Sequence, residues 1–434
     1  MPLRLDARTP GFAEAFTRLV EARRGAAADV GAAVAAILAE VRARGDAAVI
    51  DYTERFDGVR LTPDRMRVSA TEVAEARERC DKQALAALDL AAARVEAYHR
   101  RQVPVPLDYV DEAGVRLGAR WTPIQAVGLY VPGGTAAYPS TVLMNAIPAR
   151  VAGVARIAMV VPAPGGKLNP LVLAAASIAG VEEIYRVGGA QAIAALAYGT
   201  STIGAVDKIV GPGNAYVAAA KRQVSGAVGI DMEAGPSEVV VVADASGNPA
   251  WLAADLLAQA EHDPASQSIL ITDDVALADA VAGVVEGQLA RLSRAAIARQ
   301  SWNDHGAIIV VAALDGAVKL IDRLAPEHLE LAVERPEALA ARVTNAGAIF
   351  LGRYTPEAVG DYVAGPSHVL PTSRSARFSS GLGVVEFMKR TSIIGCDAAA
   401  LARIGPAAVI LAEAEGLDAH ALSVAIRLGA DKGR

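Results

Sequence analysis

The chain has 434 residues, of which 53% are hydrophobic and 21% charged, and its formal net charge at pH 7 is −6. This length and composition predict two or three folded domains with substantial cores and exclude a disordered chain. The negative charge, without dense Lys/Arg runs, argues against nucleic-acid binding. Arg150 and Arg156 interrupt the best apolar stretch, so no membrane-spanning helix is expected.

The amino terminus and the cysteine content both favour a cytoplasmic protein. Residues 1–12 contain no apolar segment of the kind found in signal peptides. Two cysteines, Cys80 and Cys396, are too few for a disulfide framework.

Residues 1 to about 105 are expected to be mainly helical, because apolar residues recur at helical spacing between charged ones. Ser69 and Thr71 are candidate helix caps in this region. From about 124, short β-branched runs alternate with Ala-rich helical stretches, which predicts parallel βαβ topology with helices on both faces of a sheet. A second such series starts near 238, so we expect two α/β domains that meet at 234–238. We expect the N-terminal helices to pack on the later domain.

Three Gly-containing turns follow predicted strands and precede predicted helices, at 130–141, 187–192 and 210–216. Backbone N–H groups at such helix starts can receive a phosphate. None has the G-x-G-x-x-G spacing, and the nearest match, at 210–216, has Tyr216 where the third glycine would be. The residues alone leave open a nucleotide site at these strand ends and ordinary turns.

The segment 258–272 carries the clearest indication of metal chemistry. Gln259 and His262 lie three residues apart at the end of a predicted apolar helix, so their side chains are expected to share a face. A carbonyl oxygen and an imidazole nitrogen suit a divalent metal, with zinc as the first choice. A histidine that caps or packs against the helix end is the alternative.

Glu327 and His328 are adjacent at a predicted helix-to-strand junction. A carboxylate and an imidazole in one cleft suit two separate proton transfers near neutral pH, whereas a surface Glu-His turn is the alternative. Other polar residues in predicted loops or near the chain end are Asp361, His368, Glu415 and His420.

Several segments, in this order, resemble the histidinol dehydrogenase family over nearly the whole chain. The sharpest match is 230–244 followed by 255–270, and the others are 325–331, 359–372, 379–384 and 415–420. The resemblance implies that the protein catalyses the last two oxidations of histidine biosynthesis. In these steps L-histidinol is oxidised through L-histidinal to L-histidine, and two molecules of NAD are reduced.

The resemblance also implies roles for individual residues. Zinc, one ion per subunit, would be bound by Gln259, His262, Asp361 and His420. Glu327 and His328 would be the acid/base pair: His328 accepts the hydroxyl proton and Glu327 activates water for the second oxidation. Substrate contacts would be made by Ser237, Gln259, His262, His328, Asp361, Glu415 and His420. Contacts to NAD would be made by Tyr130, Gln191 and Asn214.

The implied fold is α/β, with two incomplete Rossmann-like, doubly wound domains of the aldehyde-dehydrogenase kind and small helical extensions. The expected parts are an N-terminal extension (1–25), a first α/β domain with the metal and acid/base residues (26–129 plus 237–380), a second α/β domain on the NAD side (130–236) and a helical dimer arm (381–434). The implied assembly is an intertwined homodimer, in which Glu415 and His420 complete the partner's site.

Three other functions are weighed against this one. A related zinc- and NAD-dependent dehydrogenase could oxidise another primary alcohol such as a sulfonate, but an anionic substrate would favour a basic residue at Glu415. A zinc hydrolase would use Glu327 to activate water, and a non-catalytic metal-binding scaffold would leave the Glu327-His328 pair unexplained. A thiohemiacetal on a cysteine is rejected, because neither Cys80 nor Cys396 lies in a motif with an activating base.

Overall fold

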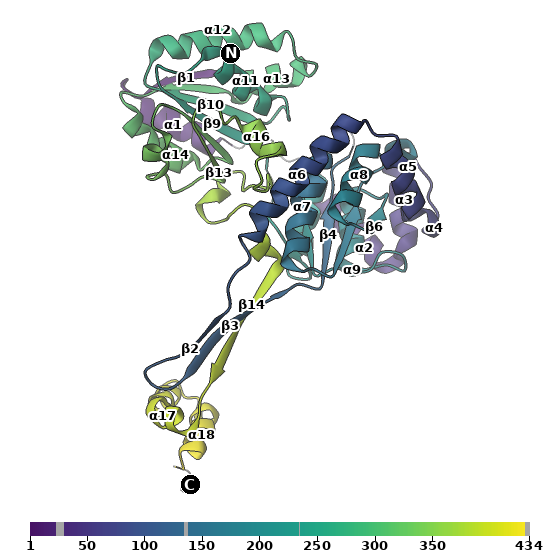
Figure 1. Cartoon of the computed structure of the whole chain (residues 1–434), viewed down its shortest axis with the longest axis vertical. Coiled ribbons are helices and arrows are strands. Elements are labelled where there is room, and N and C mark those ends of the chain that lie inside the picture. The colour runs from purple at the N-terminus through teal and green to yellow at the C-terminus, as the bar shows by residue number, and fades with distance from the viewer. Residues whose placement is uncertain (23–29, 134–137, 234, 430–434) are drawn as a thin grey trace.

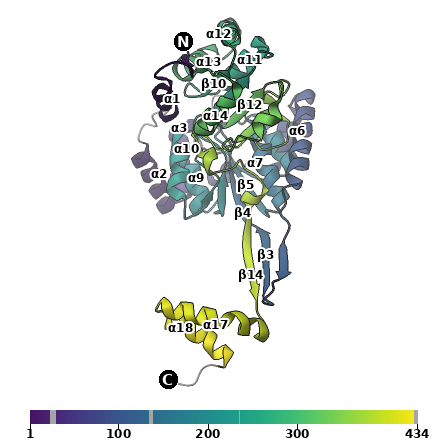
Figure 2. The same cartoon turned by 90° about the vertical axis from the view of Figure 1, so that its left-hand side faces the viewer.

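The computed structural model describes residues 1–22, 30–133, 138–233 and 235–429. Two α/β bodies lie next to each other, and a thin arm projects from them and carries the last helices at its far end (Figures 1 and 2). The part of the chain described here has no helix that is long and apolar enough to span a membrane.

One body is built on a parallel five-stranded sheet with the order β6-β5-β4-β7-β8. Its strands are β4 (Ala126–Tyr130), β5 (Arg156–Val160), β6 (Glu183–Tyr185), β7 (Lys208–Val210) and β8 (Gly229–Ile230). Its crossover helices are α7 (Pro139–Ala152), α8 (Pro170–Ala179), α9 (Gly189–Tyr198) and α10 (Ala215–Val224). Numbered along the chain, the strands follow the order 3-2-1-4-5 of doubly wound nucleotide-binding sheets, without a sixth strand.

The other body contains a parallel six-stranded sheet with the order β1-β11-β10-β9-β12-β13. Its strands are β1 (Leu3–Asp6), β9 (Glu238–Ala243), β10 (Gln267–Thr272), β11 (Ala307–Val310), β12 (His328–Ala332) and β13 (Ala348–Leu351). Strands β9 to β13 repeat the 3-2-1-4-5 order, and β1 is added at the edge beside β11. This repeated order confirms the prediction of two incomplete Rossmann-like domains.

Helices cover both faces of the six-stranded sheet. One face packs against α11 (Pro249–Ala260), α12 (Val275–Leu289) and α13 (Ala295–His305). The other packs against α1 (Phe12–Glu21), α14 (Ala317–Leu324) and α15 (Pro336–Ala340). Every residue of β9 and β10 is buried, which explains why the middle of each strand is an unbroken apolar run, at 239–243 and 269–271, rather than an alternating one.

The N-terminal helices pack against the helices of the five-stranded body. They are α2 (Gly31–Arg44), α3 (Asp46–Asp57), α4 (Pro63–Met66), α5 (Ala70–Glu78) and α6 (Lys82–Arg100). Helices α2 and α3 contact α9, whereas α5 and α6 contact α8. This packing differs from the expected grouping of 26–129 with 237–380, because the apolar faces of these helices are buried in the cores of the five-stranded body. Of the expected caps, Ser69 caps α5 in a reciprocal pair with Glu72, and Thr71 lies inside the helix.

The structure corrects one of the expected domain limits, and two others lie outside the described residues. The segment 1–25 is more than an extension, since β1 pairs with β11 as a strand of the six-stranded sheet. The limit at 25–26 and residue 234 of the expected break lie outside the described residues.

The arm is an antiparallel sheet of β2 (Leu107–Val110), β3 (Arg116–Pro123) and β14 (Met388–Gly395), followed by α17 (Ala398–Ala414) and α18 (Asp418–Ala425). The tail from 381 was expected to be helical, and β14 is the exception, because its pairing partner β3 lies far upstream in the chain. The remaining elements are α16 (Glu357–Tyr362) and 3-10 turns at Pro164–Gly166, Leu314–Gly316, Ser375–Arg377, Val384–Phe387 and Ile426–Leu428.

Candidate active site

The expected acid/base residues lie at the amino ends of strands in the six-stranded sheet. Glu327 precedes β12 and His328 begins it, after Ala325 turns the chain out of α14 with a φ of 46°. Ser237 precedes β9, the strand next to β12. Open α/β sheets commonly bind ligands at the carboxyl ends of their strands. The residues Ser237, Glu327 and His328 therefore gather at the opposite edge.

Glu327 and His328 are both buried and are held by the backbone of Glu238. The Nδ1 of His328 lies 3.0 Å from the carbonyl oxygen of Glu238 and 3.6 Å from Oε2 of Glu327. Oε2 of Glu327 accepts the backbone N–H of Glu238 at 2.9 Å. A proton on Nδ1 satisfies that carbonyl and leaves Nε2 as the basic nitrogen. Among the described residues Nε2 has no hydrogen-bond partner and lies 3.7 Å from Oδ1 of Asp361, so the neutral form of His328 leaves this nitrogen open to a substrate proton.

Burial and charge give the pair unusual proton affinities. Burial raises the pKa of Glu327 to about 7, against the opposing effect of His328. Burial alone would lower the pKa of His328, but the carboxylates of Glu357, Glu327 and Asp361 raise it well above its ordinary value. A carboxyl group with a pKa near neutral pH is suited to general-base catalysis there.

Three of the expected metal ligands converge beside this pair. Gln259 is buried in the last turn of α11, and Asp361 lies on α16, which contacts α11. The helix ends at Ala260, so His262 lies just beyond it rather than on a helical face with Gln259 as predicted. Its backbone N–H nevertheless bonds to the Gln259 carbonyl at 3.2 Å, which keeps the two residues in one turn.

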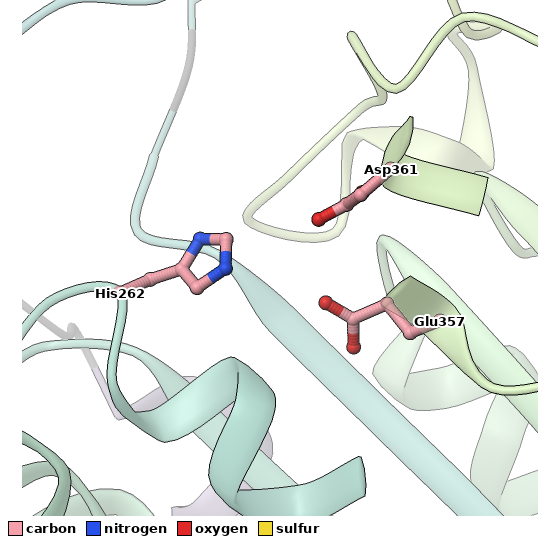
Figure 3. Close-up of side chains that lie close together, drawn as sticks. All are labelled: His262, Glu357 and Asp361. Atoms are coloured by element: carbon pink, nitrogen blue, oxygen red, sulfur yellow. The ribbon is translucent and has the colours of Figure 1, made fainter. Parts of the chain in front are cut away.

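Glu357 joins this cluster and was missed in the sequence. One ligand atom from each of His262, Glu357 and Asp361 lies within 4.8 Å of the others, and Figure 3 shows the three side chains pointing toward one another. The spacing held a signal, because Glu357 and Asp361 are four residues apart on α16 and so share a face.

The cluster fits a divalent cation. Its donors are nitrogen and oxygen atoms, the usual ligands of zinc when no cysteine takes part. Burial raises the pKa of Asp361, but His328 and His368 outweigh burial and hold it below the ordinary value, so the carboxylate is ionised near neutral pH. Buried and partly buried carboxylates that lie close together need a compensating positive charge, which a bound cation supplies.

The loop after α16 joins the cluster to the five-stranded body. The Nδ1 of His368 lies 3.0 Å from the carbonyl oxygen of Asp361, and its Nε2 lies 3.3 Å from Oγ1 of Thr141 in α7. The hydroxyl of Ser367 donates to the carbonyl of Met144 in the same helix at 3.1 Å. The sequence placed His368 only in a predicted loop, and its contacts with both α/β bodies depend on the tertiary structure.

Two expected site residues do not reach the cluster within one chain. Glu415 and His420 are exposed on the helical end of the arm, at the end of α17 and on α18. Figures 1 and 2 show these helices far from both α/β bodies.

The residues expected to contact NAD gather at the carboxyl edge of the five-stranded sheet. Tyr130 ends β4, and its hydroxyl accepts the N–H of Gly189 at 3.1 Å. Gln191 lies in the first turn of α9, where its buried Oε1 has no partner among the described residues. Asn214 caps α10. The strand order reverses between β4 and β7, so the orphaned oxygen and the two helix starts fit a nucleotide there.

A buried ion pair that the sequence did not reveal holds the loop before α10. The ammonium of Lys221 contacts Asp231 and donates to the carbonyl of Gly211 at 2.9 Å. The carboxylate of Asp231 accepts the N–H of Gly211 at 2.8 Å. Gly211 has a φ of 111°, and a Cβ there would lie 2.1 Å from the carbonyl oxygen of Tyr130, so the loop requires glycine at this position.

Breaking this ion pair is expected to destabilise the protein strongly. Asp231→Ala leaves the ammonium of Lys221 buried and uncompensated, which costs about 3–5 kcal/mol of unfolding free energy. The matched control is Asp108→Ala, which breaks the solvent-exposed pair with Arg116 and should change the unfolding free energy far less. Urea unfolding measures both. Equal losses in the two variants would contradict the structural role of the buried pair.

Comparison with known proteins gives one consistent result. The histidinol dehydrogenase family model matches residues 21–428. Histidinol dehydrogenase of Rhodospirillum rubrum is 64% identical over 429 residues, 99% of each chain. That of Ruegeria pomeroyi is 62% identical over 428 residues, again 99% of each chain.

A solved structure agrees with the sequence comparisons. The crystal structure of histidinol dehydrogenase from Elizabethkingia anophelis superposes with a TM-score of 0.95 at 37% identity, and the match covers 100% of this chain and 99% of that one. Sequence and fold thus match the same group of proteins from end to end. The chain belongs to the histidinol dehydrogenase family.

Proposed function

We propose that this protein oxidises L-histidinol through L-histidinal to L-histidine with two molecules of NAD. The observation that carries the proposal is the buried pair Glu327 and His328 beside the cluster of His262, Glu357 and Asp361. A base next to a metal-ligand cluster suits the oxidation of an alcohol that can chelate a cation. Family membership over the whole chain supports the same reaction.

The two proton transfers fall to the two members of the pair. His328 accepts the hydroxyl proton of histidinol at Nε2, which points toward Asp361 at 3.7 Å. Glu327 then takes a proton from the water that adds to the aldehyde carbon, and His328, after releasing its first proton to solvent, accepts the hydroxyl proton of the resulting hydrate. NAD supplies the hydride acceptor in both oxidations. The expected nicotinamide-side residues are Tyr130, Gln191 and Asn214.

Zinc, when bound, supplies positive charge that orients and polarises the substrate. The residues that would hold it are Gln259, His262, Asp361 and His420. Ser237 and Glu415 complete the proposed substrate contacts, with Glu415 accepting a hydrogen bond from the substrate imidazole. That contact favours an imidazole over an anionic group such as a sulfonate.

The proposed assembly is a homodimer in which each arm reaches the partner's site. Large apolar side chains are exposed along the arm, including Val110, Ile394, Ile410 and Leu411, each at least 63% exposed. Such a surface suits a protein partner rather than water. A second copy of the chain would bury it and deliver Glu415 and His420. A cytoplasmic location belongs to the same proposal and agrees with the free thiols of Cys80 and Cys396.

The test of the function is the yield of NADH from histidinol. Complete oxidation of a limiting amount of histidinol should form two NADH per substrate, with histidine as product. A single NADH per molecule, or faster turnover of an anionic primary alcohol, would favour the related dehydrogenase. Hydrolysis without any NADH would favour a zinc hydrolase.

The second oxidation is expected to depend on Glu327 and on pH. Since the pKa of Glu327 is about 7, its basic form increases as the pH rises through 7. Oxidation of supplied histidinal should therefore accelerate from pH 6 to 8 and then level off. Glu327→Gln should slow this step by about 10²-fold or more and remove the rise. An unimpaired variant, measured by stopped-flow NADH formation with histidinal, would exclude Glu327 as the base.

A further inference from the structure

Glu357 is a buried carboxylate at the centre of the cluster to which the mechanism above gives no role. It is the first residue of α16 and only 2% exposed. Its backbone N–H donates to the carboxylate of Glu330 in β12, which fixes the start of the helix against the sheet. Its Oε1 lies 4.0 Å from Nδ1 of His328, beyond hydrogen-bond distance.

The side chain of Gln259 has one amide orientation that its surroundings satisfy. In that orientation its nitrogen donates to Oε1 and Oε2 of Glu357 at 3.0 and 3.3 Å and to the carbonyl oxygen of Glu238 at 3.3 Å. The opposite orientation places the amide oxygen against these same acceptors. The amide nitrogen is the donor end of glutamine, and a backbone carbonyl can only accept, so the Glu238 carbonyl and the two oxygens of Glu357 together select the nitrogen end of the amide.

We propose that Glu357 is a positioning residue, which holds the amide of Gln259 so that its oxygen is presented to the zinc ion. The inference rests on the zinc site of the proposed function. An amide can bind a cation only through its oxygen, and a glutamine side chain rotates readily between its two ends. Both oxygens of Glu357 face the Gln259 nitrogen, which favours an outer role over direct ligation. Asp361, one turn further along α16, is the carboxylate that meets the metal.

The test measures zinc affinity by competition with a chromophoric chelator, on the full-length protein. Glu357→Met keeps the approximate shape of the side chain but cannot accept the amide N–H. It should bind zinc about 10–100-fold more weakly, the usual effect of losing an outer partner. Glu357→Gln, whose carbonyl oxygen can still accept, should recover most of that affinity. Thermal unfolding of the zinc-free proteins checks that each variant is folded.

A double-mutant cycle separates an action through Gln259 from an independent one. Gln259→Met removes the amide, so adding Glu357→Met should weaken zinc binding no further. Additive losses would show that Glu357 acts on the metal itself and would overturn the proposal. An unchanged zinc affinity in Glu357→Met would also overturn the proposal. This holds even if the pH profile of kcat shifts because Glu357 no longer acts on the protonation of His328. Absence of zinc binding by the unaltered protein would instead refute the proposed metal site.

Discussion

Replacement of His328 by asparagine is expected to lower kcat for histidinol oxidation by about 10²–10⁴-fold, the usual contribution of a positioned general base. The asparagine amide can still donate to the carbonyl of Glu238, which His328 contacts at 3.0 Å through Nδ1. It offers no basic nitrogen in place of Nε2, which lies 3.7 Å from Oδ1 of Asp361. Stopped-flow measurement of the first NADH isolates this step from the second oxidation.

The matched control is His99→Asn. His99 is also fully buried and bonds through Nδ1 to a backbone carbonyl, that of Val95 at 2.8 Å, but it lies on α6. Its replacement should lower stability while kcat stays within a few-fold of the unaltered enzyme. Zinc content should be the same in all three proteins. Near-normal aldehyde formation by His328→Asn would exclude His328 as the main base.

His420→Asn is expected to abolish activity nearly as fully, although His420 lies on the arm, away from the other site residues of its own chain. Loss of a direct ligand should exceed the roughly 100-fold effect of losing an outer one. Zinc content and kcat measure the loss together. Full activity of this variant would remove His420 from the proposed ligand set.

Mixed dimers test whether the arm serves the partner. In a dimer of one His328→Asn chain and one His420→Asn chain, one site combines both replacements and the other has neither. Random assembly of equal amounts should thus restore about a quarter of the unaltered activity, because half the dimers are mixed and half their sites are intact. No recovery in coexpressed, purified dimers would mean that each arm completes its own site.

The local elements of this protein were predictable because their signals lie within a few residues. The runs ending at Tyr130, Val160 and Val210 became strands as expected, since β-branched stretches between Gly/Pro turns suit buried parallel strands. The helix-to-strand junction at Glu327 and His328 could also be predicted, because a helix, a turn and a strand follow each other there directly in the sequence. The alternation of these units predicted doubly wound sheets, which the strand orders confirm.

Properties that depend on contacts between distant segments could not be read in this way. Periodicity shows that α2 to α6 have an apolar face, but not which sheet covers it, and the expected grouping of 26–129 with 237–380 differs from the packing. The strand β14 was missed because its pairing partner is distant. Glu357 went unnoticed because its significance lies in the amide of Gln259, on another helix.

The proposed metal ligands also show which features follow from the local sequence and which depend on the tertiary structure. Residue types and spacing indicated Gln259 and His262 as candidate metal ligands, because donor chemistry belongs to each side chain, and the family resemblance added Asp361. Their meeting at the amino edge of a sheet, beside Glu327 and His328, depends on how α11 and α16 pack and on where β12 begins. The separation of Glu415 and His420 from that cluster likewise follows from the length and direction of the arm, which arise from long-range strand pairing rather than from local sequence.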